Sequence, residues 1–285
     1  MSEQRDIPLL VFLWQWKLST TAALACRFFP ERSLPTAYHR LWLLEKAKFI
    51  REHTDRYRKR FAWGLDQKGY HAIRELLPAL REEGYKSENI GHDLLVTAVH
   101  IGDWLLGAPT GAEVFSEQQL RRYHSDYFPA WVPADESHRP DGYWNMPCGC
   151  GTLKKTIALE IELSRQCHAR YRAIGDFYAR HKVVTKVLWV TRTLSSARTI
   201  DQLVSKASPG GDAYHNFVLV PKVEELGWGA PIAIGPDAGS NVQVLLTNPA
   251  QTRPKLDCGK FNFDTRKTPF KSVIYPAPTS TEFRI

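Results

Sequence analysis

The stretch Thr156-Ile-Ala-Leu-Glu-Ile-Glu-Leu-Ser164 decides the fold of the larger part of this chain. Its alternating apolar residues predict a strand with one apolar face, because successive side chains of a strand point to opposite faces of a sheet. Glu160 and Glu162 then share the other face, roughly 7 Å apart along the strand. Upstream, the run Arg139-Pro-Asp-Gly-Tyr-Trp144 places Asp141 beside a turn that leads into a neighbouring strand.

Two carboxylates on a strand and an aspartate from the neighbouring hairpin can hold Mg²⁺, an ion that takes hard oxygen ligands and keeps several waters. The sequence therefore predicts Asp141, Glu160 and Glu162 as metal ligands and Mg²⁺ as the cofactor. The same spacing is equally compatible with a sheet that has one solvated face and carries no chemistry.

The composition indicates a folded and basic protein. A length of 285 residues gives room for two domains, at roughly 100–200 residues per domain. An apolar share of 43%, with nine tryptophans, is enough to form hydrophobic cores. The net charge of +8 favours an anionic partner, and nucleic acid is favoured over a membrane surface.

Several features predict a cytoplasmic location. No apolar run of the sequence approaches the roughly 20 residues of a membrane span, and the amino terminus lacks the pattern of a signal peptide. Five cysteines, an odd number, fit a reducing compartment better than a disulfide framework. Cys148 and Cys150 lack the two-residue spacer of common zinc sites, which argues against structural zinc.

The amino-terminal third predicts three helices followed by a two-stranded hairpin. Apolar residues recur at helical spacing over residues 5–16, Thr20 lies in a capping signal for a helix over 21–28, and Ser33 caps a third helix that reaches about residue 48. Two short strands then flank a basic loop. This order is that of a winged helix-turn-helix, whose third helix enters the major groove of DNA while the hairpin tip contacts the backbone.

The charge pattern of this region agrees with DNA binding. Lys and Arg outnumber Asp and Glu over residues 33–60. If about five phosphates were neutralised, log K would fall against log salt with a slope of roughly −4.5. The alternatives are a merely solvated loop and a winged helix that binds protein. The predicted DNA contacts come from the third helix and the loop: Thr36, His39, Arg40, Lys46, Arg56, Arg58, Lys59 and Arg60.

The remainder alternates strands with helices, which predicts an α/β domain. His92-Asp93 begins a predicted helix over 92–106 and is interpreted as part of its amino-terminal cap. A compact apolar run at 186–190 is typical of a buried strand, such as the strands of parallel sheets. The other expected elements are strands at about 114, 143–146, 156–163 and 215–220, and helices at 167–181 and 193–204.

The sequence thus predicts three parts. Residues 1–85 form the winged helix-turn-helix, and residues 86–228 form the α/β domain. Residues 229–285 carry prolines and basic side chains, which is typical of an extended segment that lies over nucleic acid or a protein partner, or of partial disorder.

In this order, several segments resemble the replication-relaxation family of bacterial and plasmid proteins, which is related to the MobC-type plasmid mobilisation proteins. The resemblance covers about residues 5–220. It implies a winged helix joined to a domain like the PD-(D/E)XK restriction endonucleases, with a mixed sheet flanked by helices. The segments that carry it are residues 38–50 with the loop that follows, Trp63-Gly-Leu-Asp-Gln-Lys-Gly69, His92-Asp-Leu-Leu-Val-Thr-Ala-Val99, Arg139-Pro-Asp-Gly142, residues 157–164 and Tyr171.

The resemblance also implies roles for single residues. Asp141 corresponds to the metal-binding aspartate and Glu160 to the acid paired with it. Two positions later, where the family motif has a lysine, this chain has Glu162, and a carboxylate cannot replace an ammonium group beside a phosphate. Lys155 is then the predicted catalytic cation, with Lys154 or Arg165 as alternatives.

Three functions remain open from the sequence. The preferred one is a double-stranded DNA-binding protein of plasmid or mobile-element replication, mobilisation or regulation, with a nuclease-like second domain. The second is an active Mg²⁺-dependent endonuclease or DNA nicking-relaxing enzyme. The third is a non-enzymatic module of protein assembly, in which the winged helix and the carboxy-terminal extension contact protein partners. The basic helix and loop favour the first function, because they indicate DNA binding without help from the family.

Overall fold

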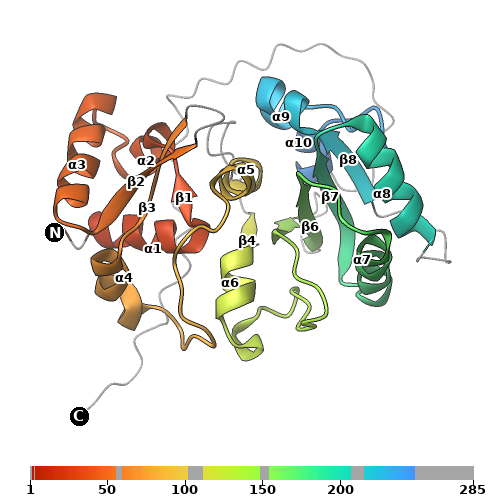
Figure 1. The fold of residues 1–285 in the computed structure, drawn as a ribbon, viewed down its shortest axis with the longest axis horizontal. Helices are drawn as coiled ribbons and strands as arrows, with labels where there is room; N and C mark the ends of the chain where they lie inside the picture. The colour runs from red at the N-terminus through yellow and green to blue at the C-terminus, as the bar shows by residue number, and fades with distance from the viewer. Residues whose placement is uncertain are drawn as a thin grey trace. The chain divides into compact units, whose positions relative to one another are not determined.

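The computed structural model describes residue 2 and residues 4–55, 60–101, 112–147, 154–206 and 215–247, with residues 55 and 60 described by their backbone alone. Met1–Pro249 form one compact unit. Within it, helices pack against a small antiparallel sheet and against a larger mixed sheet (Figure 1). Among the described residues, none of the helices has the length and apolarity that crossing a bilayer requires.

The amino-terminal elements form where local signals predict them. Side-chain oxygens of Thr20, Ser33 and Asp66 accept hydrogen bonds from the first backbone amides of α2, α3 and α4. β1, β3 and β2 form a three-stranded antiparallel sheet in that order. The bounds are α1 Asp6–Trp16, β1 Leu18–Ser19, α2 Thr21–Phe28, α3 Leu34–Lys46, β2 Ile50–Asp55, β3 Arg60–Leu65 and α4 Gln67–Ile73.

The second sheet has five strands in the order β4-β5-β6-β7-β8. β4, β5 and β6 pair antiparallel, whereas β6, β7 and β8 pair parallel, so the sheet is mixed and the α/β prediction is confirmed. The bounds are α5 Ile90–Ile101, β4 Glu113–Ser116, α6 Glu117–Arg122, β5 Gly142–Pro147, β6 Lys154–Glu162, α7 His168–Arg180, β7 Val184–Thr191, α8 Leu194–Lys206, β8 His215–Leu219, α9 Val220–Leu226 and α10 Val242–Thr247.

Both faces of this sheet are covered, so the alternative of one solvated face is wrong. Ala158 belongs to a core that α7 and α8 complete, and Glu160 on the same face is only 7% exposed. Ile157, Leu159 and Ile161 point to the opposite face, where α5, α9 and α10 supply the packing (Figure 1). The carboxylate of Glu160 is therefore buried and requires hydrogen-bonding partners.

The predicted extension is also wrong for its first part. Ile232, Val242 and Leu245 are buried in the core beneath β5 and β6, and Ile234 forms a β-bridge with Phe217. The prolines and glycines of this stretch make turns between packed residues, which composition alone does not distinguish from an extended chain. Residues 248–285 lie outside the described part.

One hydrophobic core spans the predicted boundary at residue 85. The Trp14 ring of α1 stacks on Tyr123 after α6, with 5.5 Å between the ring centroids. The indole nitrogen of Trp14 donates to the carbonyl oxygen of Gly84, and the Gln15 amide donates to the side chain of Gln119, both at 3.1 Å. The helices of the first sheet and those of the second sheet are thus joined by buried contacts.

Replacing Gly69 of α4 by alanine is expected to cost about 1–3 kcal/mol of stability, as overpacking of a tight contact does. A Cβ atom at this position would lie 1.9 Å from the carbonyl oxygen of Phe49, so the backbone must move. That oxygen also accepts the backbone amide of Asp66, which ties the start of α4 to the start of β2. Urea unfolding measures the cost. The matched control is Gly229→Ala, whose nearest neighbour atom is 4.0 Å away, and an equal loss in both variants contradicts the argument.

Candidate functional site

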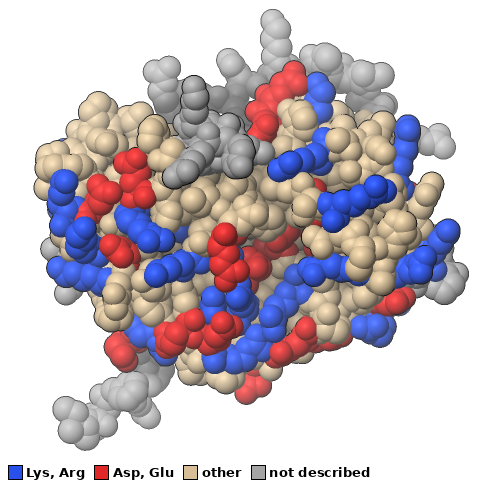
Figure 2. Space-filling view, viewed as in Figure 1, with Lys and Arg blue, Asp and Glu red and all other residues tan. Residues whose placement is uncertain are grey.

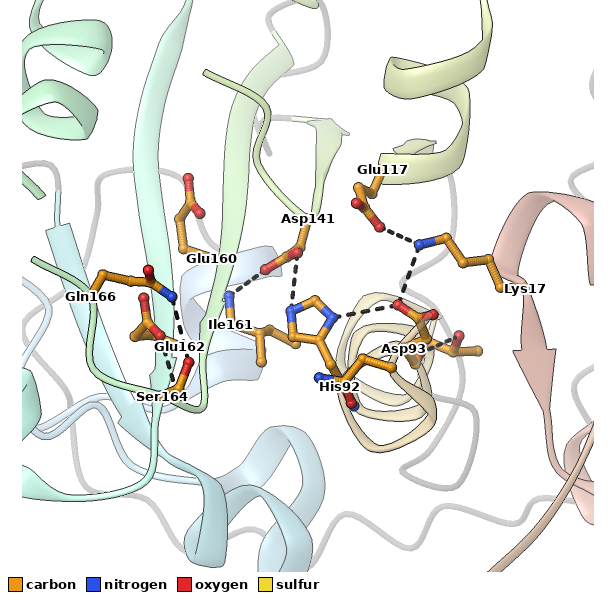
Figure 3. A network of polar contacts seen from close by, with 12 residues as sticks. Lys17, His92, Asp93, Glu117, Asp141, Glu160, Ile161, Glu162, Ser164 and Gln166 are labelled. Carbon is orange, nitrogen blue, oxygen red and sulfur yellow. Dashed lines mark hydrogen bonds and ion pairs between the residues drawn. The ribbon is translucent and has the colours of Figure 1, made fainter. Parts of the chain in front are cut away.

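Asp141 is held between the mixed sheet and α5. It directly precedes β5, and its Oδ2 atom accepts a hydrogen bond of 2.5 Å from the backbone amide of Ile161 on β6. Its Oδ1 atom lies 3.3 Å from Nε2 of His92, in the first turn of α5. Figure 3 shows Asp141 pointing toward these two groups. The carboxylate therefore fastens the start of β5 to β6 and to α5.

The contact with His92 continues into a chain of alternating charges. Nδ1 of His92 lies 3.4 Å from Oδ1 of Asp93, and the same carboxylate lies 3.3 Å from Nζ of Lys17. Lys17, which follows α1 directly, also reaches Glu117 of α6 at 2.6 Å. Four segments of the chain that are distant in sequence meet in this network (Figure 3).

The protonation states follow from burial and from these neighbours. Burial lowers the pKa of His92, but Asp141 and Asp93 outweigh it and raise that pKa to about 11. Burial likewise lowers the pKa of Lys17, and Glu117 and Asp93 raise it above its ordinary value. Burial raises the pKa of Asp141 against the opposing effect of His92. At neutral pH the network holds His92 and Lys17 as cations between carboxylates.

Glu160 has its own buried partners, one on α7 and one in the segment before β5. Its Oε1 atom accepts hydrogen bonds from the hydroxyl of Tyr178 on α7 and from Nε2 of His138, the latter at 2.6 Å. Burial lowers the pKa of His138, but the charge of Glu160 raises it overall. The lone pairs of one oxygen of Glu160 are thus directed at protein donors.

Glu162 ends β6 in a different environment. It accepts the backbone amide of Ser164 at 3.2 Å and contacts the hydroxyl of Tyr171, and burial raises its pKa. It points away from Asp141 (Figure 3). The described residues contain no group of three or more His, Cys, Asp and Glu side chains that could hold a metal ion. The predicted ligand set of Asp141, Glu160 and Glu162 is therefore not brought together around one point.

Lys155 is not brought to these acids either. It lies five positions before Glu160 on the strand, which corresponds to about 17 Å. Its ammonium group is buried and donates to the carbonyl oxygen of Leu245 in α10 at 2.8 Å. The neighbouring Lys154 pairs with Glu113 at 2.6 Å. Both lysines lie at the end of β6 that is far from Asp141. Neither could contact a phosphate group placed at Asp141.

The predicted DNA contacts fall into three groups. Thr36, His39 and Lys46 are exposed on α3. Arg40 instead turns back to the buried carboxylate of Asp6, with its Nε atom 3.3 Å from Oδ1. In the hairpin loop, Arg56, Arg58 and Lys59, together with the side chain of Arg60, lie outside the described residues.

The outer face of α3 is also partly apolar. Leu34, Tyr38 and Trp42 recur every four residues and are 52%, 48% and 37% exposed. The ring of Trp42 stacks on His39, and the ammonium group of Lys46 lies 5.4 Å from its centroid. Basic and acidic side chains are interspersed on the face seen in Figure 2.

The sequence did not indicate Lys17, His138 or Tyr178, and it gave His92 a different role. Asn89 accepts the amide of His92 at 3.2 Å and so provides the cap that His92-Asp93 was expected to supply. In the sequence, His92 and Asp93 were marked only by lying in one of the segments that resemble the family. Comparison with protein-family models, with curated proteins and with solved structures found no match to this chain.

Proposed function

We propose that this chain is a double-stranded DNA-binding protein that holds the duplex with α3 and the β2–β3 hairpin. The supporting observation is the order α1-β1-α2-α3-β2-β3 together with the sheet order β1-β3-β2. This order agrees with that of a winged helix-turn-helix, in which the third helix reads the major groove. The sequence resemblance adds a role in plasmid or mobile-element replication, mobilisation or regulation.

The packing of α3 supports this use. Ala37, Leu41 and Leu44 are buried beneath the helix, which leaves the opposite face open along its length. His39 and Lys46 on that face offer a ring nitrogen and an ammonium group, which suit base edges and phosphates. The hairpin between β2 and β3 carries a basic sequence, as the backbone-contacting tip of a wing requires.

The mixed sheet is proposed as a nuclease-like scaffold. Asp141 and Glu160 are occupied by partners from the protein itself, and Lys155 is anchored at the other end of β6. An endonuclease needs carboxylates that are open to a metal ion and a cation beside the scissile phosphate. The observed hydrogen bonds therefore favour a structural role for these acids over strand cleavage.

A role in protein assembly is the second candidate, and it is favoured by the exposed side chains of Leu34, Tyr38 and Trp42 on α3. Aromatic residues of this kind are enriched at protein interfaces. The same face cannot hold a duplex and a protein partner at once, so the two functions give different results for Trp42→Ala and Lys46→Ala.

Fluorescence anisotropy with a labelled duplex tests the proposal. Log K is expected to fall with log salt at a slope of roughly −4.5, and each of Lys46→Ala and Arg58→Ala is expected to reduce the slope by about one, because each removes one phosphate contact. The control is Arg172→Ala on the exposed side of α7. Duplex affinity that is absent or insensitive to salt contradicts DNA binding. Duplex affinity and salt slope that are unchanged in both Lys46→Ala and Trp42→Ala contradict the contact with α3 and favour protein assembly at that face instead.

A further inference from the structure

A pocket of about 160 Å³ opens where the parallel strands β6 and β7 end. Glu162, the last residue of β6, lines one part of it. Arg192 and Thr193, which follow β7, line another part, together with Ser196 of α8. In open α/β sheets, ligands bind outside the carboxyl ends of parallel strands, most often where the strand order reverses. The pocket shares the first of these features, since it lies at the carboxyl ends of β6 and β7.

The charges at this pocket point to an anion. Arg165 follows β6 and Arg192 follows β7, and both side chains are exposed. In the described part of the chain neither arginine forms an ion pair, whereas Arg81, Arg121 and Arg180 each reach a carboxylate. A guanidinium group matches the geometry of phosphate with two parallel hydrogen bonds. Two guanidinium groups on adjacent loops are thus available to donate hydrogen bonds to a phosphate in this pocket.

Hydroxyl groups complete the polar lining. The hydroxyls of Thr193 and Ser196 lie 2.9 Å apart, and Thr193 caps α8 by accepting the amide of Ser196. A hydroxyl can donate a hydrogen bond to a phosphate oxygen while its own lone pairs remain in use. The phosphate end of a ligand can therefore receive donors from both the arginines and this hydroxyl pair.

Glu162 supplies a carboxylate to the pocket, whose lining also includes Ser164, Tyr171 and Thr199. It is half-buried and already accepts hydrogen bonds from the backbone amide of Ser164 and from the side chains of Tyr171 and Gln166. A carboxylate oxygen has room for a further donor, and a sugar hydroxyl is such a donor. A bare phosphate ion would leave this acceptor unused, whereas a phosphorylated sugar would satisfy both ends of the lining.

We infer that this pocket binds a phosphate monoester carried on a sugar, with Arg165 and Arg192 on the phosphate and Glu162 accepting a sugar hydroxyl. Two sources share this chemistry, namely a mononucleotide and the 5′-phosphorylated end of a DNA strand. The pocket contains no residue of α3, so it is separate from the surface that we propose to bind the duplex.

Isothermal titration of the full chain tests the inference with deoxyadenosine 5′-monophosphate and with deoxyadenosine. The monophosphate is expected to bind at least about tenfold more tightly, and Arg165→Gln and Arg192→Gln are each expected to weaken it about tenfold, because a charge-assisted hydrogen bond is lost. Glu162→Gln, which keeps an acceptor oxygen, is expected to have a smaller effect than Glu162→Ala. The matched control is Arg198→Gln, exposed on α8 but outside the pocket.

Short single strands with a 5′-phosphate or a 5′-hydroxyl distinguish the two sources. Preference for the phosphorylated strand over the mononucleotide identifies a strand end, and the reverse preference identifies a mononucleotide. Equal binding of deoxyadenosine and its monophosphate, no binding of any probe, or full binding by the double variant Arg165→Gln/Arg192→Gln overturns the inference. The double variant is expected to retain duplex affinity. The test of the pocket is therefore independent of the test of duplex binding by α3.

Discussion

Replacing Lys17 by methionine is expected to lower the free energy of unfolding by about 3–5 kcal/mol, the usual cost of removing one partner from a buried ion pair. The side chains of Lys17 and Asp93 are only 9% and 6% exposed. Without the ammonium group, Asp93 keeps His92 but loses its second cation, and Glu117 must turn to solvent. Methionine fills a similar volume, so the loss reports on charge rather than on a cavity. Urea or guanidinium unfolding measures it.

The double variant Lys17→Met/Asp93→Leu separates pairing from packing. Removing both charges leaves no unpaired ion at the most buried contact, while Glu117 is partly exposed and His92 keeps Asp141. We therefore expect the double variant to recover part of the stability that Lys17→Met loses. Lys222→Met is the surface control, because Lys222 pairs with Glu225 in a largely exposed position. The prediction is contradicted if Lys17→Met lowers the free energy of unfolding no more than Lys222→Met does.

Replacing Asp141 by alanine is expected to destabilise the fold by about 3 kcal/mol, the lower end of the range for a buried pair. The smaller figure reflects side-chain exposures of 13% for Asp141 and 23% for His92. The substitution leaves the backbone amide of Ile161 without its acceptor and removes the largest counter-charge of His92. Denaturant unfolding at neutral pH gives the cost, with Asp176→Ala on the exposed face of α7 as the control.

The pH dependence of stability provides an independent readout of the same pair. The pKa of His92 rises from 6.5 to about 11 on folding, so its contribution is complete below pH 6.5 and is lost as pH rises toward about 11. Without Asp141, the pKa of His92 falls and the alkaline loss becomes smaller. If the stability of Asp141→Ala falls with rising pH as steeply as that of the parent chain, the carboxylate of Asp141 is not the cause of the raised pKa of His92.

Local signals in the sequence were sufficient to predict most elements of the fold. Thr20, Ser33 and Asp66 cap helices because a side-chain oxygen needs only an amide one to three residues away. The apolar run of β7 likewise indicates a buried strand, whereas the alternation in β6 predicts the strand but not the burial of its second face. The domain boundary at residue 85 and the extension from residue 229 depend on distant packing, which composition does not record.

The candidate site was harder to predict because its contacts are distant in sequence. Lys17 meets Asp93 across 76 residues, and His138 meets Glu160 across 22. No spacing rule links such pairs, whereas strand geometry alone is enough to separate Lys155 from Glu160. Arg40 shows the same difficulty, because its position on α3 suggested DNA while its partner Asp6 lies on another helix.

The stacking of Trp14 on Tyr123 limits how this protein can be dissected. A fragment that ends near residue 85 would lack Tyr123, so the indole ring of Trp14 on α1 would be exposed to water. The amino-terminal elements are consequently not an independent folding unit. Transferring them to another protein would require the mixed sheet as well.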